Sequence, residues 1–142
     1  MKFITKVFFA ILGCSSVDFE EISFFNVNGA YNLISITDTS LSIQSGRIQG
    51  IMTYSPFIFT FLDSTASFSN LSCSQFYPNL IYATFTFINI SNCSFLFSFE
   101  KFGNLEVCAI YLEYNMSFII SNSKFDSLSN SLGGPVNICF SF

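Results

Sequence analysis

A short repeated phrase decides the fold expected of this chain. Residues 90–95 read Ile-Ser-Asn-Cys-Ser-Phe, and residues 120–125 read Ile-Ser-Asn-Ser-Lys-Phe. An earlier version, Phe-Ser-Asn-Leu-Ser-Cys, occupies residues 68–73, and fainter versions begin at Ile43 and Ile22. The repeat starts near 22, 43, 68, 90 and 120 are unevenly spaced, which is typical of a fixed strand–turn–strand unit that carries loops of different length.

A second apolar segment lies between successive copies of the phrase. These segments are continuous runs rich in Ile, Val, Phe and Tyr, which is the pattern of strands buried in parallel sheets. They occupy residues 33–36, 57–61, 80–87, 107–112 and 136–140. Each repeat therefore offers at least two strands, and residues 17–142 are expected to form about five stacked coils.

Composition also favours β-structure in a single domain. Of the 142 residues, 51% are hydrophobic, only 10% are charged and 21 are Phe. The polar residues are mainly Ser, Thr and Asn, which are poor in helix interiors but common in turns. The charges are scattered singly and the net charge is −4, so the basic patch that nucleic acid requires is missing. No apolar run is long enough for a transmembrane helix. We therefore expect neither a nucleic-acid partner nor a transmembrane helix.

Two motifs carry a resemblance to a known kind of repeat. The first is the Ile-Ser-Asn phrase at residues 90–95 and 120–125; the second is Gly-Gly-Pro-Val-Asn-Ile at residues 133–138, with a decayed counterpart at residues 108–111. Through them, residues 60–142 resemble right-handed parallel β-helix proteins of the pectin-lyase-like type, especially the polymorphic outer-membrane-protein repeats. Pro135 stands where that repeat has Ala. The resemblance implies an all-β, right-handed parallel β-helix that is extracellular or on the cell surface. We also expect the chain to be a segment of a longer solenoid.

Stacked coils would align equivalent residues of the repeats into columns, because successive coils lie about 4.8 Å apart. One interior column is expected to hold Ile43, Phe68, Ile90 and Ile120, and another Val27, Ile48, Cys73, Phe95 and Phe125. A third set, Asn70, Asn92 and Asn122, falls where the strand should turn. The amides of these three residues are expected to hydrogen-bond along the stack as an asparagine ladder.

Two interpretations of residues 1–16 stay open. Lys2 and Lys6 precede an apolar run at residues 7–12 and small residues at 13–16, which is the arrangement of a weak export signal. The same residues also fit an edge segment at the start of the solenoid.

Asparagines in the triplet Asn-x-Ser invite a prediction of N-glycosylation. Four such triplets begin at Asn70, Asn89, Asn92 and Asn115. A ladder asparagine held in a buried turn cannot carry a glycan. Asn115 lies outside the ladder and is therefore the best candidate.

The sequence offers little for catalysis or for metal binding. The cysteines at 14, 73, 93, 108 and 139 show no metal-ligand spacing, and the chain has no His to complete a mixed site or to activate a Ser. Asp38, Asp63, Arg47 and Lys124 read as isolated, solvated charges rather than as a cluster on consecutive coils. We predict no enzyme activity, no metal and no cofactor in this chain.

The pattern favours a structural or adhesive β-helix segment that presents a ligand-binding face to carbohydrate or to a surface protein. The alternative is the non-catalytic part of a carbohydrate-active β-helix, of the polysaccharide lyase or hydrolase type. Strand edges at the coil ends also predict self-association, because unpaired backbone groups recruit other chains.

Overall fold

The computed structural model describes residues 7–30, 32–96, 110–114, 117–126 and 136–139; within them, side chains are described except at 7–9, 30, 54–56, 77–78 and 136–139. These ranges contain fifteen strands and no helix, so they hold no helix that could cross a membrane. The strands are β1 (Val7–Leu12), β2 (Ser16–Phe19), β3 (Ile22–Phe25), β4 (Asn28–Ala30), β5 (Asn32–Thr37), β6 (Ser40–Ile43), β7 (Gly46–Leu62), β8 (Thr65–Ser69), β9 (Leu71–Thr84), β10 (Phe87–Ser91), β11 (Ser94–Leu96), β12 (Ile110–Glu113), β13 (Phe118–Ser121), β14 (Lys124–Asp126) and β15 (Val136–Cys139).

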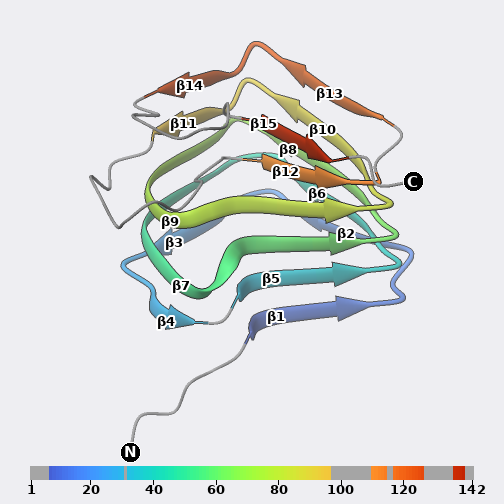
Figure 1. Ribbon diagram of the computed structural model, residues 1–142, viewed down its shortest axis with the longest axis horizontal. Coiled ribbons are helices and arrows are strands. Elements are labelled where there is room, and N and C mark those ends of the chain that lie inside the picture. The colour runs from blue at the N-terminus through green and yellow to red at the C-terminus, as the bar shows by residue number, and fades with distance from the viewer. Residues whose placement is uncertain (1–6, 31, 97–109, 115–116, 127–135, 140–142) are drawn as a thin grey trace, which may run out of the picture.

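The strands wind into a parallel β-solenoid, as the repeats predicted (Figure 1). All pairings between the described strands are parallel. A small sheet has five described strands in the order β13-β10-β8-β6-β2, and a large sheet has ten, running from β1 through β5, β7, β9 and β11 to β14, with β3, β4, β12 and β15 attached. Each coil thus crosses from the large sheet to the small one and back.

Alternation along the strands decides which side chains fill the solenoid. In β8 and β10 every second residue is buried, so Ala66 and Phe68 point inward as Ile88 and Ile90 do. The Phe68 ring packs edge-on against Phe61 of the large sheet, with ring centres 5.8 Å apart. Burying such a side chain stabilises the fold by roughly 1.5–3 kcal/mol. The core therefore lies between the two sheets.

Two of the predicted interior columns are confirmed over most of their length. In the small sheet, Phe68 pairs with Ile43 on one side and Ile90 on the other, and Ile90 pairs with Ile120. In the large sheet the pairings run through Ile48, Cys73, Phe95 and Phe125. The rings of Phe95 and Phe125 stack with centres 4.9 Å apart.

The first repeat begins three residues earlier than the sequence suggested. Phe19, not Ile22, pairs with Ile43, and Phe24, not Val27, pairs with Ile48. Ile22 instead pairs with Gly46. The first copy was misaligned because two glutamates follow Phe19 where later copies have Ser and Asn, while Ile-Ser at 22–23 imitates the start of the phrase.

The amino-terminal residues that invited two interpretations form a strand from residue 7 onward. β1 pairs in parallel with β5, and Ile11 lies beside Ile36 at the end of the large sheet. Ile11 is partly buried against the core. Processing of this segment as an export signal stays a prediction.

Candidate functional site: a groove along one row of turns

One row of turns joins the large sheet to the small sheet, and each turn is made by a residue with a left-handed backbone. The φ angles are 66° at Gly13, 50° at Asp38, 48° at Asp63, 49° at Phe85 and 54° at Tyr114. Gly adopts this conformation freely and Asp tolerates it, whereas a bulky residue there costs roughly 1–2 kcal/mol. We call these five positions the turn row. Phe85 and Tyr114 are bulky residues of the turn row, so their backbones are strained. Backbone strain of this kind is more often found at functional sites.

A ladder of hydroxyl groups fixes these turns under the surface. Thr39 Oγ1 donates to the carbonyl of Thr37 at 3.0 Å and accepts the backbone N–H of Cys14 at 3.1 Å. Ser64 repeats this geometry one coil further on, accepting the N–H of Thr39 at 3.4 Å and donating to Leu62 at 2.6 Å.

Thr86 repeats the same geometry in the following coil. Thr86 Oγ1 accepts the N–H of Ser64 at 3.3 Å and donates to the carbonyl of Thr84 at 2.9 Å. The side chains of Thr39, Ser64 and Thr86 are buried, so these bonds satisfy polar groups that water does not reach. The turn row is consequently rigid from one coil to the next.

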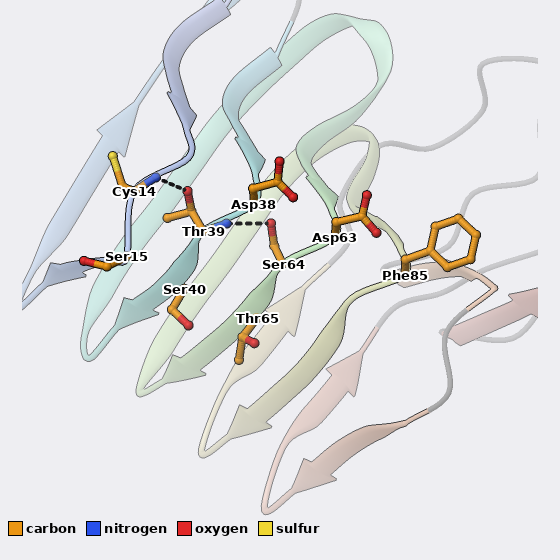
Figure 2. Close-up of a pocket in the computed structure, with 9 residues that line it drawn as sticks. All are labelled: Cys14, Ser15, Asp38, Thr39, Ser40, Asp63, Ser64, Thr65 and Phe85. Carbon is orange, nitrogen blue, oxygen red and sulfur yellow. Dashed lines mark hydrogen bonds between the residues drawn. The ribbon is translucent and has the colours of Figure 1, made fainter.

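An open groove of about 420 Å³ runs over this ladder. Figure 2 shows the carboxylates of Asp38 and Asp63 on adjacent coils, pointing to the same side, with the ring of Phe85 beyond them. Hydroxyl groups of the following strands complete the lining. The groove is lined by Cys14, Ser15, Asp38, Thr39, Ser40, Asp63, Ser64, Thr65 and Phe85.

Aromatic residues continue this surface into the next coil. The exposed rings of Phe85 and Tyr114 stack with centres 5.3 Å apart and an interplanar angle of 13°. On the outer face of the large sheet, Tyr82 stacks on Tyr111 at 5.8 Å and 19°, and Phe57 lies 4.9 Å from Tyr82. We call Phe57, Tyr82, Phe85, Tyr111 and Tyr114 the aromatic strip.

A carboxylate lies inside the aromatic strip. The hydroxyl of Tyr82 donates a hydrogen bond to Glu113 Oε2. Burial, followed by the hydrogen bond and the negative charge of Glu113, raises the pKa of Tyr82 to about 12. Tyr82 therefore stays a protonated donor at neutral pH, hydrogen-bonded to the carboxylate of Glu113.

This surface combines hydrogen-bond acceptors with exposed aromatic rings. Asp38, Asp63 and Glu113 supply hydrogen-bond acceptors, and the exposed rings supply flat apolar faces. Within the described ranges, no three His, Cys, Asp or Glu side chains gather as metal ligands would. The predicted lack of catalysis and of cofactors stays a prediction.

The asparagines predicted to form a ladder lie on a different row of turns, between the small sheet and the next part of the large sheet. Asn70, Asn92 and Asn122 share a left-handed backbone, with φ of 52°, 52° and 47°, and all three are exposed. Asn70 Nδ2 donates to the carbonyl of Gln44 at 3.3 Å rather than to another asparagine. Their tolerance of positive φ explains their recurrence, and amide bonding between them stays a prediction.

Small side chains after these asparagines build a short ladder of their own. The N–H of Cys93 donates to Ser123 Oγ at 3.1 Å, and that hydroxyl donates to the carbonyl of Ser121 at 2.8 Å. The remaining predicted site residue, Asn115, lies outside the described residues.

Sequence reasoning missed the groove, although a signal for it was present. Residues 38–40 read Asp-Thr-Ser and residues 63–65 read Asp-Ser-Thr, which is a turn-forming Asp followed by a hydroxyl residue in two successive repeats. Phe85 departs from this pattern, so its position in the turn row could not be read from the chain.

Comparison with known proteins yields no match: no protein family, no curated protein and no solved structure is detectably similar to this chain.

Proposed function

We propose that this chain is a structural and adhesive segment of an extracellular or cell-surface solenoid, and that the groove over the turn row is its ligand-binding face. The observation that carries the proposal is the pair of parallel carboxylates, Asp38 and Asp63, beside the exposed stacked rings of Phe85 and Tyr114 (Figure 2). Kinship with the polymorphic outer-membrane-protein repeats belongs to this proposal, supported by the parallel solenoid and the register of the Ile-Ser-Asn phrase.

Rigidity is what makes such a surface suited to adhesion. The buried hydroxyls of Thr39 and Ser64 tie the turns of successive coils together through the backbone. Groups held by supporting hydrogen bonds on a scaffold of strands lose little conformational freedom when a ligand binds. The groove therefore offers fixed acceptors to a partner.

The proposal is tested by coating beads with the chain and counting beads attached to intact cells of its source organism. The double substitution Asp38→Asn with Asp63→Asn is expected to reduce attachment about tenfold, because two charge-assisted hydrogen bonds lose their charge. Asp18→Asn is the matched control, since Asp18 is an exposed residue of β2 outside the groove. Attachment that is absent from the start, or unchanged in the double variant, would contradict the proposal.

The same preparation tests the prediction that this chain has no enzyme activity of its own. Incubation with polyuronides and with neutral polysaccharides should release no new reducing ends. Release of products by this chain would replace the adhesive function with a catalytic one.

A further inference from the structure

The aromatic strip and the groove form one continuous surface along successive coils. Tyr82 pairs with Tyr111, and Thr84 pairs with Glu113, so the strands β9 and β12 present equivalent side chains side by side. Phe85 and Tyr114 follow directly after these strands. The two ring stacks are three residues apart along the chain, a separation of at most about 10 Å. Aromatic rings and carboxylate acceptors thus lie next to one another on this surface.

The electrostatics of this surface are one-sided. Asp38, Asp63 and Glu113 bring negative charge to it. The basic side chains within the described ranges are held elsewhere: Lys124 pairs with Asp126 at 2.8 Å, and Arg47 lies 5.8 Å from the ring centre of Phe25. A ligand with acidic groups would therefore meet like charge, whereas a ligand rich in hydrogen-bond donors would meet acceptors.

We propose that the aromatic strip and the adjoining groove bind a linear saccharide chain that carries no acidic groups. A sugar ring has a face of C–H groups that packs on an aromatic ring and an edge of hydroxyls that donate hydrogen bonds. The exposed pair of Phe85 and Tyr114 provides a platform for one position of the chain, and the partly exposed pair of Tyr82 and Tyr111 lies beside it for a second. The carboxylates of Asp63 and Glu113 accept hydroxyls beside them, and charge-assisted hydrogen bonds of this kind are about twice as strong as neutral ones.

The backbone strain at Phe85 supports this assignment. Asn or Gly in the turn row would remove the strain, as in the asparagine turns on the opposite row. An aromatic ring that is 59% exposed contributes little to the core in return. The presence of Phe85 in a strained turn, stacked on a second aromatic residue in the same conformation, is accounted for by contact with a ligand.

The test is calorimetric titration of the whole chain with hexasaccharides of cello-, chito-, manno- and malto-series, and with hexagalacturonate as the acidic probe. At least one uncharged probe should bind, and hexagalacturonate should bind at least tenfold more weakly than that probe. Phe85→Asn should lower the affinity for the uncharged probe about tenfold, since it removes a platform worth on the order of that factor. Asn tolerates the left-handed backbone, so this variant keeps the fold.

Phe25→Asn is the matched control, because Phe25 is an aromatic residue of similar exposure on β3, away from the strip. Its affinity for the saccharide should equal that of the unmodified chain. Binding of none of the uncharged probes, preference for hexagalacturonate, or indifference to Phe85→Asn would each overturn the proposal.

This inference rests on the proposed function only in using the same groove, and the two can fail separately. Bead attachment that depends on Asp38 and Asp63 without any saccharide binding would leave the adhesive function standing and exclude this ligand class. If the chain binds a saccharide and Phe85→Asn removes this binding, but the beads do not attach to cells, the ligand class would stand and the adhesive function would be excluded.

Discussion

The backbone N–H of Thr39 donates a hydrogen bond to Ser64 Oγ in the next coil, 3.4 Å away, and both residues are buried. Ser64 Oγ at the same time donates to the carbonyl of Leu62 at 2.6 Å. One hydroxyl therefore satisfies a donor in one coil and an acceptor in another. The solenoid depends on such groups because its turns bring backbone polar atoms beneath the surface, where water cannot hydrogen-bond to them.

Ser64→Ala is expected to destabilise the chain by roughly 1–3 kcal/mol, because it leaves the N–H of Thr39 buried without its acceptor. Urea unfolding followed by circular dichroism measures the change. Ser67→Ala, in the neighbouring strand β8 on its outer face, is the control and should change the free energy of unfolding by less than about 0.5 kcal/mol. Equal effects of the two substitutions would show that the ladder does not hold the turns.

A second prediction concerns the stability of the turn row. Phe85→Asn should raise the free energy of unfolding by roughly 0.5–1 kcal/mol, because Asn tolerates the φ of 49° better than Phe does. The same substitution is expected to weaken saccharide binding, so stability and function should move in opposite directions. A loss of stability on thermal unfolding would mean that the Phe85 ring supports the fold rather than a ligand.

The register of the small sheet predicts a large loss of stability at one isoleucine and a small loss at another on the neighbouring strand. Ile90 is fully buried at the centre of its column, so Ile90→Ala should cost roughly 2–5 kcal/mol. Ile119 points outward from β13 and is 50% exposed, so Ile119→Ala should cost less than about 0.5 kcal/mol. The free energies of unfolding of both variants are measured by denaturant unfolding. A large loss of stability for Ile119→Ala would show that the register described for β13 is wrong. Ile119 also lies on the outermost described strand of the small sheet, where the sequence predicts self-association.

Alkaline pH should weaken the fold through Tyr82. Its pKa in the folded chain is about 12, above the ordinary value of 10, so the folded state holds this proton more tightly than the unfolded state does. The resulting stabilisation is complete below pH 10 and disappears as the pH rises from 10 to 12.

Tyr82→Phe has no such proton to lose. Its stability should therefore fall less steeply than that of the unmodified chain over the same interval, in unfolding curves measured at each pH. Cys73, whose pKa burial raises well above its ordinary value, contributes equally to both proteins and cancels in the comparison. Parallel pH profiles for the two proteins would show that the proton of Tyr82 does not stabilise the fold.

Much of the fold could be predicted because its determinants are local. The spacing from Phe68 to Ile90 carries strict alternation and a turn-forming Asn in each copy, and the structure pairs these residues as expected. The first repeat failed because Glu20 and Glu21 replace the Ser-Asn signal, which left Ile22 as a false start.

The groove could not be predicted because it depends on stacking rather than on neighbours in sequence. Asp38 and Asp63 each look like a solvated turn residue, and they come together only because their coils are adjacent (Figure 2). Phe85 takes a turn position that its residue type disfavours, so no propensity indicates it. Recurrence of Asp followed by a hydroxyl residue was the single signal in the chain.

The position of the ligand on the solenoid is measured most directly by amide chemical-shift changes on titration with the tightest-binding uncharged hexasaccharide. The largest changes are expected at Asp38, Asp63 and residues 82–85 and 110–114, on the turn row and the aromatic strip. Changes concentrated instead at Asn70, Asn92 and Asn122, on the opposite row of turns, would contradict the assignment of the binding face.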